Sequence, residues 1–369
     1  MSASFATPEG TIKYSVKFPE QEKSGHFRDF MGLKVSSVGL GTYLGGQNDQ
    51  DDALYIEAIQ SALLSGCNLI DSAINYRCMR SERNIGKALK TLIGEGKISR
   101  EEVVICTKGG FTPFDGSQPP NPMKYFEDEY FKPGICGPDD IVAGCHCMTP
   151  SYLRNQVERS LKNLGLDSID LYYLHNPETQ LDEVARDEFL FRLDKAFREL
   201  EKLVKEGKIR AYGTATWNGY RVAPGAQEYL SLHDILKTAE NVGGEAHHFK
   251  AIQLPYNLGM AEAFGIRNQM MGSQTLSILQ AAYANDLAVF TSASILQSKL
   301  SRNLPPFVSE ALPGLQTDAQ RAIQFVRSTK GVTSALVGMK RKEHVEENLK
   351  VAFVHPVPQE QLEKFFSEK

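Results

Sequence analysis

Three titratable residues end apolar, strand-like runs of the sequence. Asp71 lies late in NLIDSA, Lys108 closes VVICTK and His175 closes IDLYYLH. Tyr76 follows Asp71 by five residues, in the segment that leaves the same run. Because the carboxyl ends of the strands in a parallel barrel meet at one rim, side chains at these four positions can converge on a single site.

The four residue types suit proton transfer to a carbonyl oxygen. A tyrosine with a pKa of about 10 is a weak acid at neutral pH unless a nearby cation lowers that pKa. Lys108 can supply the cation, and Asp71 can keep a buried lysine charged. A neutral His175 can donate a hydrogen bond to the carbonyl oxygen or help to relay a proton. Each residue alone is more often a solvated side chain, but their joint placement predicts a catalytic group.

Short β-type runs alternate with helix-type segments from about residue 35 to residue 350, as in repeated βα units. The predicted strands are Val35–Gly41, Leu69–Ala73, Val103–Thr107, Ile169–Leu174, Ile209–Thr214, Ala251–Leu254, Ala288–Ser292 and Ser334–Val337. The predicted helices are Asp52–Leu64, Ser81–Leu92, Pro150–Leu164, Glu188–Lys205, Gln227–Glu240, Gln274–Asn285, Gln316–Thr329 and Glu343–Val351. Eight such pairs without a linker between halves predict one (β/α)8 barrel domain over residues 1–369.

A doubly wound sheet is the alternative fold. It usually carries a GxGxxG motif after its first strand, but here Gly39, Gly41 and Gly45 break that spacing. The barrel is therefore the favoured architecture.

Three segments lie outside the repeat. Residues 1–34 are polar and rich in turn residues, and they are expected to form a hairpin or a strap across the bottom of the barrel. Residues 109–148 follow the third strand and are rich in glycine and proline, so they are expected to form a lid over the active face. Residues 352–369 are expected to form a C-terminal tail.

Composition narrows the class of partner. The 41 basic and 45 acidic residues give a net charge of −4, and no basic stripe with interleaved aromatics favours nucleic acid. No apolar run approaches the roughly 18 to 20 residues that span a bilayer, and the polar start lacks the pattern of a signal peptide. The six scattered cysteines are typical of reduced thiols, so the expected location is the cytoplasm.

One cysteine-rich motif raises the question of a metal site. Cys145, His146 and Cys147 are consecutive, and Cys136 precedes them. This spacing does not match the common structural zinc patterns, so no metal is expected and the segment is interpreted as a loop with free thiols.

Several motifs together resemble the aldo-keto reductase superfamily. VGLGTY, NLIDSAINY, VVICTKGG, DLYYLHNPE, IRAYGTATW, IQLPYN and VGMKRKEHVEENLK match its landmarks in order over roughly residues 35–352. The resemblance implies that Tyr76 is the general acid, that Lys108 and Asp71 tune it, and that His175 orients the substrate. It also implies an oxidoreductase that transfers hydride from a nicotinamide cofactor to an aldehyde or ketone, so the partner is a small carbonyl or alcohol. The oligomeric state stays open.

A second function is kept as the alternative. Some members of the family are nicotinamide-binding regulatory or channel-associated subunits with little turnover. The complete set of Asp71, Tyr76, Lys108 and His175 argues against this alternative, because a sensor has less need of a tuned acid.

The resemblance also implies a set of cofactor contacts. These are Gly41, Thr42, Tyr43, Asp71, Thr216, Gln253, Ser292, Gly338, Lys340, Arg341, His344, Glu347 and Asn348. Two positions depart from the family pattern near the nicotinamide: Ala215-Thr216 stands where Ser-Asn is common, and Thr291 stands where many members stack a tyrosine.

A third departure affects the cofactor's 2′-phosphate. His344 occupies the position where an arginine commonly binds this group, and histidine is a poor substitute at neutral pH. Lys340 and Arg341 can compensate as point charges after the last strand, where barrels commonly bind phosphate. NADPH is the favoured cofactor, and NADH is the alternative.

Overall fold

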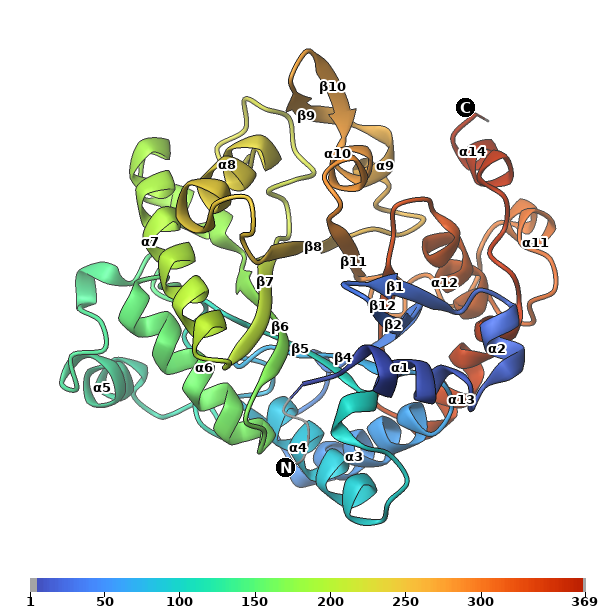
Figure 1. Ribbon diagram of the computed structural model, residues 1–369, viewed down its shortest axis with the longest axis horizontal. Coiled ribbons are helices and arrows are strands. Elements are labelled where there is room, and N and C mark those ends of the chain that lie inside the picture. The colour runs from blue at the N-terminus through green and yellow to red at the C-terminus, as the bar shows by residue number, and fades with distance from the viewer. Residues whose placement is uncertain (1–4, 368–369) are drawn as a thin grey trace.

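Eight parallel strands close into a barrel in the computed structural model, which describes residues 5–367 (Figure 1). The strands are β3 (Val38–Gly41), β4 (Leu69–Asp71), β5 (Val104–Gly109), β6 (Ile169–His175), β7 (Ile209–Ala215), β8 (Phe249–Pro255), β11 (Ala288–Ser292) and β12 (Ser334–Gly338). Each pairs with the next in the chain, and β12 pairs with β3 to close the ring. The predicted (β/α)8 fold and all eight barrel strands are confirmed.

Helices surround the barrel as an outer ring (Figure 1). They are α3 (Asp49–Leu63), α4 (Arg80–Gly94), α6 (Pro150–Leu164), α7 (Arg186–Lys205), α8 (Leu232–Gly243), α10 (Ile278–Ala284), α12 (Asp318–Ser328) and α13 (Lys342–Asn348). Their apolar faces pack on the outer side chains of the strands in one large core. Because both faces of each strand are covered, the strands are continuous apolar runs rather than alternating ones.

The predicted helix Gln274–Asn285 is wrong over its first turn. Residues Gln274–Ser277 form strand β10, which pairs antiparallel with β9 (Arg267–Met271) in a small hairpin. The helix begins only at Ile278, because the Ser277 side chain accepts a hydrogen bond from the Gln280 backbone N–H and caps the helix there. The first predicted strand is likewise divided, since its start belongs to β2 (Leu33–Ser36).

The N-terminal segment closes one end of the barrel. It contains α1 (Pro8–Ser15), α2 (Pro19–Lys23) and a hairpin of β1 (Phe27–Phe30) with β2. Phe30, Leu33 and Val35 pack against the inward side chains of the strands, and the Phe30 ring lies 5.4 Å from that of Phe290. The interior is therefore filled at this end, which leaves the carboxyl ends of the strands for a cavity.

The middle of the segment between β5 and α6 packs against the outside of α6. It contains α5 (Pro122–Phe126), and its Phe126, Tyr130 and Cys147 form a small core with Tyr152 of α6. In Figure 1, α5 lies outside the helical ring rather than over the barrel. The role of residues 109–148 as a lid stays a prediction.

The C-terminal segment packs on the helical layer. It ends in α14 (Gln359–Ser367), whose Phe365 ring lies 5.3 Å from that of Phe325 in α12. Two further short helices, α9 (Glu262–Gly265) and α11 (Pro306–Ala311), lie in the connections that follow β8 and β11. Among residues 5–367, no helix is long and apolar enough to cross a membrane.

Candidate active site

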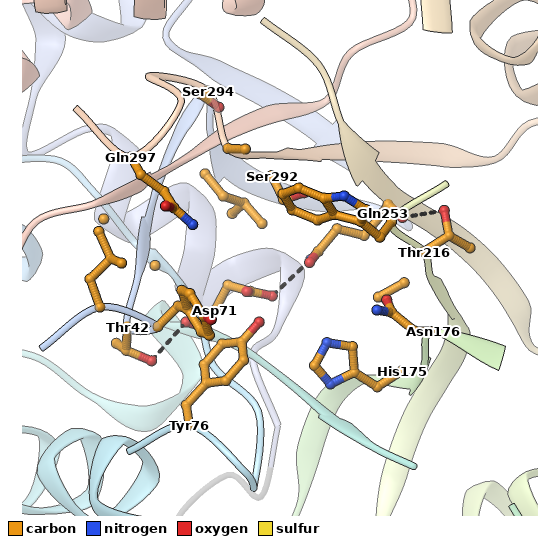
Figure 2. A pocket seen from close by; sticks show the side chains of 18 of the residues that line it. Thr42, Asp71, Tyr76, His175, Asn176, Thr216, Gln253, Ser292, Ser294 and Gln297 are labelled. Atoms are coloured by element: carbon orange, nitrogen blue, oxygen red, sulfur yellow. Dashed lines mark hydrogen bonds between the residues drawn. The ribbon is translucent and has the colours of Figure 1, made fainter. Parts of the chain in front are cut away.

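A cavity of about 480 Å³ opens at the carboxyl ends of the barrel strands. Residues at or just after the end of every barrel strand line it, which is where barrel enzymes place their functional groups. Its volume lies in the usual range for ligand pockets. Figure 2 shows the Tyr76 hydroxyl and the His175 ring pointing into the same part of this space.

A buried ion pair lies beneath the cavity floor. Lys108 Nζ donates to Asp71 Oδ1 at 2.5 Å and to the Ser72 carbonyl oxygen at 2.6 Å. Gln253 Nε2 donates to the other Asp71 oxygen at 2.9 Å, the contact drawn in Figure 2. Burial is the largest influence and opposes the charge on Lys108, but Asp71 and Tyr76 together more than offset it and raise the lysine pKa above its usual value. Lys108 therefore stays a cation in a site without water contact.

Tyr76 lies directly against this cation. Lys108 Nζ is 5.1 Å from the centre of the Tyr76 ring. Burial raises the pKa of Tyr76, and Lys108 opposes this rise by lowering it. The expected lowering by a lysine is therefore present, but burial exceeds it and the net pKa is above the usual value. Tyr76 holds its proton at neutral pH and can donate it when negative charge develops nearby.

His175 is the fourth residue of the predicted catalytic group and has a neutral ring. Its centre lies 5.8 Å from that of Tyr76, and the edge of one ring faces the other. Burial, then the charge of Lys108, lowers the pKa of His175 well below its usual value. Its Nδ1 has no hydrogen-bond partner in the part of the chain that the structure describes. A neutral imidazole that lines the cavity can donate a hydrogen bond to a carbonyl oxygen.

His146, from the Cys-His-Cys motif, supports His175 from below. Its Nε2 donates to the His175 carbonyl oxygen at 2.7 Å, and Gln180 Nε2 donates to its Nδ1 at 2.9 Å. Burial lowers the pKa of His146 to about 4, so the ring is neutral. Within residues 5–367, no cluster of three or more histidine, cysteine or acidic side chains could hold a metal ion. Both nitrogens of His146 thus serve the protein scaffold.

A left-handed turn follows Tyr76. Arg77, Cys78 and Met79 have φ angles of 49°, 55° and 66°, a conformation that side chains other than glycine rarely adopt. The Arg77 guanidinium holds the turn, because it donates to the Gly46 carbonyl oxygen at 2.8 Å and to Asp52 at 2.5 Å. Nothing in the sequence predicted this turn, which fixes where the Tyr76 ring enters the cavity.

The structure brings eight of the predicted cofactor contacts into the cavity wall and leaves five outside it. Those in the wall are Gly41, Thr42, Tyr43, Asp71, Thr216, Gln253, Ser292 and Gly338. Those outside it are Lys340, Arg341, His344, Glu347 and Asn348. Arg341 and His344 are exposed, and Lys340 Nζ lies 2.9 Å and 3.0 Å from the two carboxylate oxygens of Asp51.

The cavity also contains residues that the sequence did not single out. Asn75 and Asn176 are the immediate neighbours of Tyr76 and His175, and both line the space. Adjacency to a predicted catalytic residue was the available signal for these two. Ser294 and Gln297 come from the irregular loop after β11, which has no periodic pattern to reveal them (Figure 2).

Comparison with known proteins agrees with this geometry. Residues 37–232, more than half of the chain, match the model of the aldo/keto reductase family. The NADH-specific methylglyoxal reductase of Escherichia coli is 30% identical over 208 residues, which cover 55% of this chain and 54% of that protein. The L-galactose dehydrogenase of Arabidopsis thaliana is 24% identical over 345 residues, 86% of this chain and 84% of that protein.

Solved structures share the fold along most of the chain. An aldo-keto reductase of Bacillus halodurans in its holo form has a TM-score of 0.62 at 19% identity and covers 92% of this chain and 95% of its own. A Klebsiella pneumoniae aldo/keto reductase in complex with NADP and acetate has a TM-score of 0.60 at 20% identity, covering 90% and 91%. The chain spans about half the length of several curated relatives that it matches, from 42% to 54%. On the family match, this chain belongs to the aldo/keto reductase family.

Proposed function

We propose that the protein reduces an aldehyde or ketone with a nicotinamide cofactor, using NADPH in preference to NADH. One observation carries this proposal. Tyr76 lies half-buried beside the Lys108 cation, which Asp71 holds charged; it keeps its proton at neutral pH, and its hydroxyl faces the cavity (Figure 2). Solved structures in complex with NADP or NADPH support this choice of cofactor, whereas the NADH-specific reductase of Escherichia coli keeps NADH as the alternative.

The cavity fits a nicotinamide in its chemistry. Thr216, Gln253 and Ser292 bring polar groups to the wall formed by β7, β8 and β11. Gly41 and Gly338, at the ends of β3 and β12, continue this wall beyond β11 and present backbone without side chains. When bound, the cofactor supplies the hydride.

The chain's own residues supply the proton and the surroundings. Tyr76 donates its hydroxyl proton to the carbonyl oxygen as negative charge develops there. Lys108 stabilises the resulting tyrosinate through space, and the burial of Lys108 strengthens this interaction. The neutral His175 directs the carbonyl oxygen towards Tyr76, and Phe111 packs 5.0 Å from the His175 ring and covers one side.

A reduction assay tests the proposal. The purified protein is mixed with NADPH and a panel of small aldehydes, quinones and sugars, and the loss of reduced nicotinamide absorbance is followed together with alcohol formation. We expect stoichiometric oxidation of NADPH with at least one carbonyl class. If NADPH binds but no carbonyl oxidises it in a single turnover, the regulatory alternative replaces the enzyme.

A further inference from the structure

The loop that follows β7 rests on one buried carboxylate. Glu178 Oε1 accepts hydrogen bonds from the backbone N–H groups of Trp217, Asn218 and Gly219 at 2.7, 3.2 and 3.3 Å. Glu178 is buried, and its Oε2 has no partner among the described residues. A carboxylate that accepts several backbone N–H groups fixes the path of a loop that has no regular structure of its own.

Glu178 also stands close to the catalytic group along the chain. It lies three residues after His175, in the short 3-10 helix Pro177–Asp182 that leaves β6. Asn176 adopts a left-handed conformation with φ of 43°, and its N–H donates to the Ala215 carbonyl oxygen at 2.6 Å. The turn after His175 is thereby tied to the end of β7, and Glu178 reaches the residues that follow Ala215.

Trp217 is the side chain that this anchor places in the cavity wall. Its side chain is large and apolar, yet it is 42% exposed. Arg221 adds a second tie, because its Nη1 donates to the Trp217 carbonyl oxygen at 3.0 Å. Tyr43, also exposed, comes from β3, four strands away in the ring of eight and therefore on the opposite side of the mouth. Two aromatic faces thus flank the entrance.

The charged side chains in the cavity wall limit the class of substrate that Trp217 and Tyr43 can contact. Asp71 is the one charged side chain among the described residues that line the cavity. One of its carboxylate oxygens accepts a hydrogen bond from Lys108 and the other accepts one from Gln253. No cation is available in this wall for a carboxylate or phosphate on the substrate. Aromatic side chains gain energy from contact with flat, apolar groups.

We propose that Trp217 determines substrate specificity and that Glu178 is its positioning residue. The favoured substrates are uncharged carbonyl compounds with a planar ring next to the carbonyl group. This inference rests on the proposed carbonyl reduction and adds a substrate class to it. The substrate ring can contact the indole only while the backbone N–H groups of Trp217 and Gly219 remain hydrogen-bonded to Glu178.

The first experiment compares benzaldehyde with propanal as substrates. In Trp217→Ala, the ratio of kcat/KM for benzaldehyde to that for propanal should fall about tenfold, the scale of a lost aromatic contact. Most of the loss should appear in KM, because the indole is proposed to contact the planar ring of the substrate and takes no part in the proton transfer. Trp217→Phe keeps an aromatic face and should retain most of the ratio.

The second experiment uses tryptophan emission as a reporter that does not depend on activity. Trp217 is the only tryptophan of the chain, so its fluorescence reports this loop alone. Glu178→Ala leaves three backbone N–H groups without their acceptor, and we expect a shifted emission and a lower selectivity ratio. Glu178→Gln keeps an oxygen that can accept these bonds and should restore both. If Glu178→Ala does not fold, Glu178→Asp takes its place. This variant shortens the side chain by one methylene, so the emission should shift and the selectivity ratio should fall in the same direction.

Glu201 offers a matched control. It is also a buried glutamate that holds a loop, since its Oε1 accepts the His248 backbone N–H at 2.8 Å ahead of β8, at the amino end of that strand. Glu201→Ala should lower stability while the selectivity ratio and the Trp217 emission stay as in the wild type. An active wild type whose ratio is unchanged by Trp217→Ala or by a folded Glu178→Ala or Glu178→Asp overturns this inference. A wild type that reduces no carbonyl overturns the proposed function instead, and unchanged emission in Glu178→Ala would then overturn the anchoring role separately.

Discussion

The two ends of the proposed cofactor and substrate site differ in how their charged side chains are held. At one end Asp71 and Lys108 are buried and Tyr76 is half-buried, and each contacts another member of the group. At the other end, after β12, Arg341 is exposed and Lys340 is half-buried in an ion pair with Asp51. Charges in a site without water interact strongly, whereas exposed charges are screened. The chemistry of the first end is therefore fixed by the fold, and the second end can only modulate binding.

Removal of the buried cation should give the largest effect. Lys108→Met takes away the charge that stabilises the Tyr76 oxyanion, so kcat should fall by about 100- to 10,000-fold, the usual contribution of a general acid. It also leaves Asp71 buried without its counter-ion, which should lower the free energy of unfolding by about 3–5 kcal/mol. Steady-state kinetics and urea denaturation measure the two effects.

A double variant separates stability from chemistry in this test. Asp71→Asn combined with Lys108→Met removes both charges, so most of the stability should return while kcat stays low. Recovery of kcat in the double variant would show that the single variant was inactive only because it was unstable, and the two ends of the site would then no longer differ in the way described.

Glu178 is a further buried titratable group near this end of the site, and its ionisation should make the free energy of unfolding depend on pH. Burial raises its pKa from the usual 4.5 to about 7, so the folded protein binds this proton more tightly than the unfolded chain does. The resulting stability is fully present below pH 4.5 and is lost as the pH rises through about 7. The free energy of unfolding relative to Glu178→Gln, which cannot ionise, should therefore fall by about 3 kcal/mol between those limits. Urea titrations of both proteins across this range measure it, and a constant difference would contradict the assignment.

The smallest effects are expected at the exposed end. If Arg341 contacts the 2′-phosphate, Arg341→Ala should raise the Kd of NADPH by about two- to fivefold, because an exposed charge pair contributes roughly 0.2–1 kcal/mol. Asp51→Asn should act in the opposite direction, since it releases Lys340 from its ion pair. Cofactor titrations at low and high salt measure both changes.

NADH is the matched control for this pair of variants, because it lacks the 2′-phosphate. Its Kd should change less than that of NADPH in both proteins, and high salt should reduce the difference. Equal changes for the two cofactors would remove Lys340 and Arg341 from the phosphate site.

The sequence predicted the parts of this molecule that depend on local pattern. Each barrel strand is a short apolar run, and Lys108 and His175 were recognisable because a polar residue closes such a run. The β9–β10 hairpin was missed because the strands are short and the buried residues of β9, Asn268 and Gln269, are polar, so no apolar alternation marks them. The eight contacts in the cavity wall could be placed through the family resemblance, whereas that resemblance alone could not show that Lys340 is paired with Asp51.

The remaining features depend on contacts between distant parts of the chain. The hydrogen bonds of His146 to His175 and of Glu178 to Trp217 join residues 29 and 39 positions apart. The turn at Arg77 depends on Asp52, 25 positions earlier. Such contacts leave no periodic signal in the sequence, and they become visible only when the barrel brings neighbouring strand ends together.

The most direct test of the account is a single-turnover measurement on Tyr76→Phe with NADPH already bound. The variant keeps the ring that contacts Lys108 and His175 but has no proton to donate. We expect NADPH to bind with nearly the affinity of the wild type, while its oxidation by an aldehyde slows by about 100- to 10,000-fold. Oxidation at the wild-type rate would contradict the central claim that Tyr76 is the general acid.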